Sequence, residues 1–178
     1  MSFAIFLDID GVLNSHKTCM ATPEGHFGVT DSRLRILSQV VKNMEKGGED
    51  VKIILTSDWK LMSEESDDYT YLVSRMASYD MEIFDKTVDR SYAYRGEGVL
   101  NYLESHQEIE EFVIFDDNKF DYDKYNKLWE SLLLTKNEMT EDEGIDEAHY
   151  ASKTPSVAAI LVLSDIKDAT EAIFGKNK

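Results

Sequence analysis

Two aspartates separated by one residue follow a short apolar run near the beginning of the chain. The run is Phe3 to Leu7, and Asp8, Asp10 and Gly11 come directly after it. Side chains two residues apart on a strand point to the same side, so we expect both carboxylates to face one cleft. Carboxylates this close repel each other, and one stays protonated unless a cation lies between them. Gly11 permits a sharp turn that would bring backbone amides toward a bound anion.

Two later apolar runs also end in polar side chains. The run in "VKIILTS" ends at Thr56 and Ser57, and the run in "EFVIFDD" ends at Asp116 and Asp117. Ligands of open parallel α/β sheets bind outside the carboxyl ends of the strands, and several carboxylates there suit a hard cation such as Mg²⁺. One carboxylate is then able to attack a phosphoryl group, and another to act as general acid and base. An isolated Asp-x-Asp pair most often lies in a solvated loop. Here three apolar runs all end in polar side chains, and this coincidence favours a functional site.

Apolar runs alternate with segments of helical spacing along the chain. We expect strands at Ala4–Leu7, "VKIILTS", "MEIFD", "EFVIFDD" and Val157–Leu163. We expect helices at Arg33–Lys46, Glu64–Ser78, Gly98–His106, Tyr122–Leu134 and Ile166–Phe174. Strands that alternate with helices predict an α/β, three-layer Rossmann-like fold around a mostly parallel central sheet.

The composition bounds the class of protein. The chain has 178 residues, and 19 Lys and Arg against 35 Asp and Glu give a net charge of −16. A surface of this sign repels nucleic acid and anionic membranes, so we expect no membrane partner and no extended nucleic-acid surface. A single cysteine and the absence of a signal-peptide pattern favour a cytoplasmic protein. We expect one domain over 1–178, with an acidic insertion at about 136–155 that includes the stretch Glu138–Glu147.

Four segments resemble, in order, the motifs of the haloacid dehalogenase (HAD) superfamily of phosphohydrolases. They are "LDIDGVLN", "IILTSDWK", "YRGEGVLNYL" and "FVIFDDN", and together they span residues 3–118. The details "TSDWK" and "RGEGVLNYL" look like the small HAD domains associated with RNA-repair proteins. The chain departs from the family pattern after Asn118, where we expect the acidic insertion to displace the last strand.

The resemblance implies a role for each acidic residue of the motifs. Asp8 would be the nucleophile that carries a phospho-aspartate, and also a Mg²⁺ ligand. Asp10 would be the general acid and base, with its backbone carbonyl on the metal. Asp116 would bind Mg²⁺ directly or through water, and Asp117 would support it. The implied activity is the Mg²⁺-dependent hydrolysis of a phosphomonoester.

Two hydroxyl groups and one cation complete the implied site. Thr56 would hydrogen-bond a phosphoryl oxygen, with Ser57 as its substitute at the strand end. Arg95 would stabilise the phospho-aspartate, and Lys86 is the alternative for this role. Arg95 is favoured because it directly precedes a helical stretch, where the motif normally places its basic residue.

The spacing of the motifs leaves little room for a cap, the inserted domain that selects substrates in most HAD enzymes. Too few residues separate Asn14 from Asp31 for a separate domain. We therefore expect minimal or no cap and an open site, which admits a bulky phosphorylated substrate such as a nucleotide or a nucleic-acid end. The negative net charge argues against a long polynucleotide, and the sequence leaves the substrate open.

Four side chains near the motifs carry weaker signals. Trp59 is expected to pack in the core rather than stack on a nucleobase. Lys60 is expected to be solvated rather than bound to a substrate phosphate. His16 and His26 have no paired metal-ligand pattern and are expected to be ordinary loop residues.

Two other classes of function stay open. A phosphate-accepting signalling module also combines acids, a hydroxyl and a basic group, and Asp58 is its one candidate acceptor. The acceptor of such modules ends a middle strand, whereas the Asp-x-Asp pair here follows the first. A non-catalytic HAD-fold binding protein is the second alternative, although the polar residues expected of an active enzyme are all present.

Overall fold

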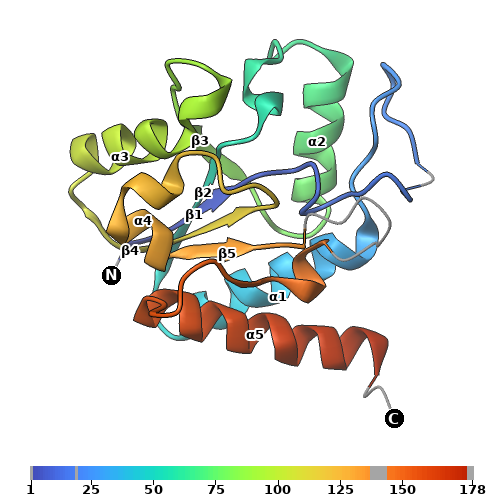
Figure 1. Cartoon of the computed structure of the whole chain (residues 1–178). Helices are drawn as coiled ribbons and strands as arrows, with labels where there is room; N and C mark the ends of the chain where they lie inside the picture. The colour runs from blue at the N-terminus through green and yellow to red at the C-terminus, as the bar shows by residue number, and fades with distance from the viewer. Residues whose placement is uncertain (1, 19, 137–143, 176–178) are drawn as a thin grey trace.

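A six-stranded sheet forms the centre of the computed structural model, which describes residues 2–18, 20–136 and 144–175 (Figure 1). The strands are β1 (Ser2–Leu7), β2 (Asp50–Leu55), β3 (Ile83–Lys86), β4 (Ile109–Asp116), β5 (Leu132–Leu134) and β6 (His149–Tyr150). Their order across the sheet is β3-β2-β1-β4-β5-β6. Neighbouring strands from β3 to β5 are parallel, and only β6 is antiparallel. The mostly parallel sheet confirms the predicted α/β, Rossmann-like class.

In the described part of the chain, five α-helices cover the two faces of the sheet. They are α1 (Asp31–Lys46), α2 (Asp67–Ala77), α3 (Arg95–Ser105), α4 (Asn126–Glu130) and α5 (Val157–Phe174). Phe3, Ile5 and Leu7 of β1 belong to an apolar cluster that includes residues of α1, α2 and α5. Ala4 and Phe6 point to the opposite face, into a cluster with residues of α3 and α4. Both faces of β1 are buried, which explains why its apolar run is uninterrupted.

The segment predicted as the last strand, Val157–Leu163, is instead the first part of α5. In Figure 1 this helix lies beside α1, below the sheet. The Ser156 hydroxyl caps it by accepting a hydrogen bond from the backbone N–H of Ala159 at 3.1 Å. The buried side chains recur every three or four residues, at Ala158, Ala159, Val162, Ile166 and Ala169. A continuous apolar run does not by itself distinguish a buried strand from a helix, and here the helix is formed.

The helix predicted over Tyr122–Leu134 is also wrong in its second half. The helix α4 ends at Glu130, and Leu132–Leu134 forms β5, paired with β4 from Ile114 to Asp116. Leu132 and Leu133 are buried on opposite faces of the sheet, as successive strand residues must be. The last parallel strand therefore precedes the acidic stretch, and the expectation that an insertion displaces it is not met.

Part of the predicted acidic insertion at 136–155 joins the sheet. Residues 137–143 lie outside the described residues; the next ones form the 3₁₀ helix η4 (Gly144–Glu147) and then β6. The backbone N–H of Ile145 donates to the carbonyl of Val12 at 3.0 Å, so η4 is attached to the turn that follows Asp10. That this stretch is an insertion, and that residues 1–178 form one domain, stay predictions.

The segment between β1 and α1 forms a small hairpin, not a domain. Ala21 and Phe27 pair in antiparallel fashion. The carboxylate of Asp68, on α2, accepts hydrogen bonds from the Thr22 hydroxyl at 2.8 Å and from the Glu24 backbone N–H at 2.9 Å. This arrangement agrees with the expected minimal cap. Among the described residues, no helix has the length and apolar character needed to cross a membrane.

Adjacent substitutions in α5 test its assignment as a helix. Val162 is fully buried, whereas Leu161 is 59% exposed. We expect Val162→Asp to lower the free energy of unfolding by about 3 kcal/mol or more, because it buries an uncompensated charge. Leu161→Asp should cost less than about 1 kcal/mol, because its side chain stays in water. Urea-induced unfolding measures both values, and equal losses would contradict the helix.

Candidate active site

Three neighbouring strands, β2, β1 and β4, end side by side at one edge of the sheet. Asp8 and Thr56 directly follow β1 and β2, and Asp116 is the last residue of β4. Backbone hydrogen bonds continue past the strand ends: Asp8 donates to the carbonyl of Phe115, and Thr56 to that of Leu7, both at 2.9 Å. The sheet thus sets the backbone positions of Asp8, Thr56 and Asp116.

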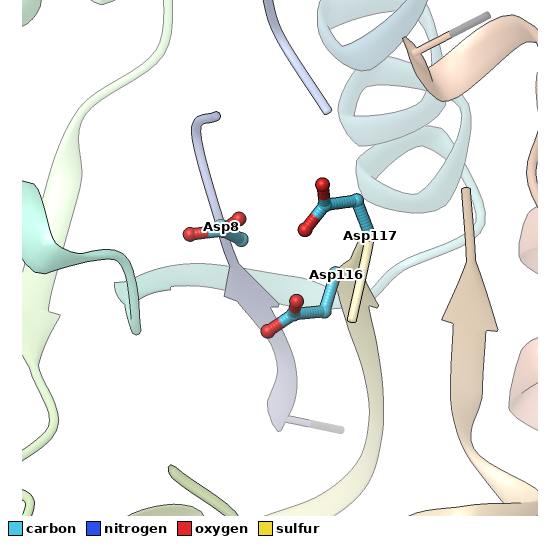
Figure 2. A group of neighbouring side chains, drawn as sticks. All are labelled: Asp8, Asp116 and Asp117. Atoms are coloured by element: carbon cyan, nitrogen blue, oxygen red, sulfur yellow. The ribbon is translucent and has the colours of Figure 1, made fainter. Parts of the chain in front are cut away.

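Three carboxylates converge at this edge. Ligand oxygens of Asp8, Asp116 and Asp117 all lie within 4.8 Å of one another, and Figure 2 shows the side chains meeting from the ends of adjacent strands. Asp8 is 3% exposed and Asp116 is fully buried. Gly11 has a φ of +81°, and a Cβ on it would lie 2.3 Å from a carboxylate oxygen of Asp117. A glycine is therefore required for the turn to approach this cluster.

The cluster carries more negative charge than its surroundings neutralise. Burial raises the pKa of Asp8 to about 7, against the lowering effect of Arg95, and the negative charges of Asp117 and Asp10 raise it further. Burial and the charge of Asp8 raise the pKa of Asp116 well above its usual range. A divalent cation would favour the ionised carboxylates, and three carboxylate oxygens are the hard donors that Mg²⁺ takes. The donor set thus fits such an ion.

One buried guanidinium contacts the cluster directly. Nη1 of Arg95 lies 2.9 Å from Oδ1 of Asp8 and 3.2 Å from Oδ2 of Asp116. Its Nη2 lies 3.3 Å from a carboxylate oxygen of Asp58, at the mouth of the site. Lys86, the alternative cation, pairs instead with Glu64 at 2.8 Å. The structure therefore brings Arg95 to Asp8, and not Lys86.

The beginning of α3 is fixed where Arg95 needs it. The Asp121 carboxylate accepts hydrogen bonds from the backbone N–H groups of Gly96 at 2.6 Å and Glu97 at 3.3 Å. An acidic side chain here satisfies free helix N–H groups and complements the helix dipole. A Cβ on Gly96 would lie 2.9 Å from the Asp121 carboxylate. The glycine in "RGEG" thus lets Asp121 hold the turn that carries Arg95.

The two predicted hydroxyl groups lie beside Asp8 but differ in their hydrogen bonding. The Ser57 hydroxyl accepts a hydrogen bond from the Trp59 backbone N–H at 3.5 Å, and its interaction with the Asp8 carboxylate lowers the pKa of Asp8 slightly. The Thr56 hydroxyl is buried and has no hydrogen-bond partner among the described residues, and neither has Nε of Arg95. Buried polar atoms without a partner are rare in folded proteins, so each needs an explanation. A bound anion such as a phosphoryl group would provide acceptors for both.

Asp10 is exposed and is not one of the three clustered carboxylates, although its charge acts on Asp8 and Asp117. Its Oδ2 accepts a hydrogen bond from Nε1 of Trp59 at 2.9 Å. Trp59 is 3% exposed, which confirms that it packs in the core, but its polar contact was not predicted. Lys60 was expected in solvent and is instead buried, donating to the carbonyl of Thr56 at 3.0 Å. Lys60 can be buried because the carboxylate of Asp89 pairs with its ammonium group.

Several residues of the site escaped the sequence analysis. The Tyr122 hydroxyl donates to Oδ2 of Asp116 at 3.1 Å, and Asp121 holds α3. The spacing of the glycines in "RGEG" was the available signal for Asp121, because a glycine at a helix start often admits a close neighbour. The loop histidine His26 contacts Asp68 at 2.5 Å, and Asp68 is not one of the predicted site residues.

Comparison with known proteins identifies the family of the chain. The family described as "HAD domain in Swiss Army Knife RNA repair proteins" matches residues 4–148. No curated protein matches the chain. A crystal structure of a hypothetical protein from Xanthomonas campestris is similar, with 14% identity over 99% of this chain and 88% of that one, at a TM-score of 0.47. The family match spans most of the chain, and we conclude that this protein belongs to the HAD domains of Swiss Army Knife RNA repair proteins.

Proposed function

We propose that the protein is a Mg²⁺-dependent phosphomonoester hydrolase that works through a phospho-aspartate on Asp8. The observation that carries the proposal is the contact of Asp8 with Arg95, at 2.9 Å, within a buried carboxylate cluster. A nucleophilic carboxylate needs a neighbouring positive charge once it holds a phosphoryl group. Asp8, Asp116 and Asp117, with the backbone carbonyl of Asp10, would hold Mg²⁺, which when bound would offset the negative charge of the phosphoryl oxygens.

The reaction has two steps. An oxygen of Asp8 attacks phosphorus, the bond from phosphorus to the leaving oxygen breaks, and the carboxyl proton of Asp10 passes to that oxygen. In the second step the Asp10 carboxylate removes a proton from water, and the water oxygen attacks phosphorus. The bond from phosphorus to Asp8 then breaks, which releases phosphate and restores the free carboxylate. Arg95 and the Thr56 hydroxyl donate hydrogen bonds to the phosphoryl oxygens throughout.

The proposed substrate is a nucleotide or the phosphorylated end of a nucleic acid. The family description supports this class. The Tyr92 ring is 62% exposed and lies next to Arg95, whose guanidinium carbon is 5.5 Å from the ring centre. Arg90 and Lys124 lie over the neighbouring Tyr94 ring at 3.9 and 5.3 Å. An exposed aromatic ring with cations nearby, beside a phosphate site, suits a base and its sugar-phosphate, whereas the net charge of −16 disfavours a long polynucleotide.

Removal of the proposed nucleophile tests the activity. We expect Asp8→Asn to abolish phosphate release from a generic phosphomonoester with Mg²⁺ present, because a carboxamide does not form the phospho-enzyme. Colorimetric phosphate release measures the rate. Asp58→Asn, at the candidate acceptor of a signalling module, should retain turnover. Full activity of Asp8→Asn, or a stable phosphoryl group on Asp58 without turnover, would refute the proposal.

Metal binding is tested separately by thermal unfolding. At one hundred times its Kd, Mg²⁺ should stabilise the wild-type protein by about 2.7 kcal/mol. In a domain of this size, that raises Tm by about 5–10 °C. Asp116→Asn should remove the shift, because it deletes one ligand from the cluster. Glu110→Gln, at an exposed site on the same strand, should keep it. A shift that survives Asp116→Asn would place the ion elsewhere.

The substrate class is tested by comparing nucleoside monophosphates with ribose 5-phosphate, which lacks the base. Stacking on Tyr92 should favour the nucleotides in kcat/KM by about tenfold, at the lower end of the usual range of about 1–3 kcal/mol per stacked base. Tyr92→Ala should remove this preference and leave hydrolysis of ribose 5-phosphate nearly unchanged. Phe84→Ala, at an aromatic ring exposed on β3, is the matched control. A preference that survives Tyr92→Ala would exclude the ring as the stacking site.

A further inference from the structure

Asp10 is exposed, yet both of its carboxylate oxygens are held. Nδ2 of Asn14 donates to Oδ1 at 2.9 Å, and Nε1 of Trp59 donates to Oδ2 at 2.9 Å. An exposed aspartate without such partners turns freely about its side-chain bonds. Here two N–H donors from different segments determine the plane of the carboxylate.

The Asn14 amide is itself fixed. Its Oδ1 accepts a hydrogen bond from the Gly11 backbone N–H at 3.3 Å, and Nδ2 also donates to the carbonyl of Phe27 at 3.0 Å. Asn14 is 3% exposed. The carbonyl and both amide hydrogens are therefore used, which leaves the amide one orientation. The hairpin between β1 and α1 is thereby connected to Asp10.

The packing of the Trp59 ring in the apolar core holds its indole N–H beside Asp10. Trp59 lies in the 3₁₀ helix η1 (Asp58–Leu61), which follows β2 after Thr56 and Ser57, and its ring belongs to the large apolar cluster. A buried indole N–H needs an acceptor, and the fold supplies the Asp10 carboxylate instead of a backbone carbonyl. The packing of the ring sets the position of Nε1, and Nε1 sets the position of the carboxylate.

We propose that Trp59 is a positioning residue for Asp10. This assignment rests on the proposed function, in which Asp10 gives a proton to the leaving oxygen and later removes one from water. The indole N–H, together with the Asn14 amide, holds the carboxyl group where these transfers take place. Proton transfer depends on donor and acceptor lying at hydrogen-bond distance in the correct orientation.

The test is the dependence of the rate on the leaving group. An alkyl phosphate such as glycerol phosphate needs a proton on its leaving oxygen, whereas p-nitrophenolate leaves without one. Trp59→Phe keeps most of the buried ring and deletes the N–H. We expect it to lower kcat/KM for glycerol phosphate by about tenfold or more, and for p-nitrophenyl phosphate by less than about threefold. Asp10→Asn should give the same pattern with a larger loss, and Trp59→Phe should add nothing to it.

The second tryptophan provides the control. Trp129 packs on the other apolar cluster, so Trp129→Phe should leave both rates unchanged. It also assigns the indole N–H signals in a proton–nitrogen NMR spectrum, in which Asp10→Ala should shift the Trp59 signal and not that of Trp129. Equal losses on both substrates, or an unmoved Trp59 signal, would overturn the assignment. A wild-type protein inert toward every phosphate ester would overturn the proposed function, and this assignment with it.

Discussion

The burial of two carboxylates against one guanidinium is the interaction on which the site depends. Asp8 and Asp116 are almost completely removed from water, and each ion removed in this way costs several kcal/mol unless it is paired. Arg95 contacts both, yet it carries one positive charge and also faces Asp58. Burial raises the pKa of Asp8 to about 7 despite Arg95, and the negative charges of Asp117 and Asp10 add to this rise. A divalent cation complements this excess of negative charge, which is why the cluster and the cation suit each other physically.

The surrounding fold holds Asp8, Asp116 and Arg95 in place. Parallel pairing of β1 with β4 brings Asp8 beside Asp116, and Asp121 holds the start of α3 so that Arg95 reaches both. The Tyr122 hydroxyl adds a hydrogen bond to Asp116. Phe120 has a φ of 38° although it is not a glycine, and its ring lies 4.3 Å from the guanidinium of Arg95. Strained backbone of this kind is concentrated at functional sites, where neighbouring contacts maintain it.

Two aspartates of one strand end acquire different chemistry from their surroundings. Asp8 is buried beside a guanidinium, and Asp10 is exposed and held by neutral N–H donors. Ile9, between them, is fully buried and anchors the backbone of both. Pairs of carboxyl groups with contrasting environments are a common means of dividing the roles of nucleophile and acid. This contrast supports the proposed division of roles, with Asp8 as nucleophile and Asp10 as acid and base.

Local patterns predicted much of the fold. The runs before Asp8, Thr56 and Asp116 were recognisable as strands because burial on both faces leaves no polar interruption. Two elements were not recognisable in this way. The run Val157–Leu163 has no periodicity that separates helix from strand, and β5 is too short to stand out after α4. In both cases the neighbouring elements, and not the local sequence, decided the conformation.

The sequence by itself determined which side chains end the three central strands, and the sign of their charge. It also favoured Arg95 over Lys86, through the position of Arg95 before a helical segment. Only the tertiary structure decided that Arg95 meets Asp8 and that the Trp59 indole meets Asp10. Both contacts join residues far apart in the chain, and their geometry depends on how η1 and α3 pack beside the sheet. Local composition and spacing do not encode that packing, because it arises from the burial of side chains contributed by the whole domain.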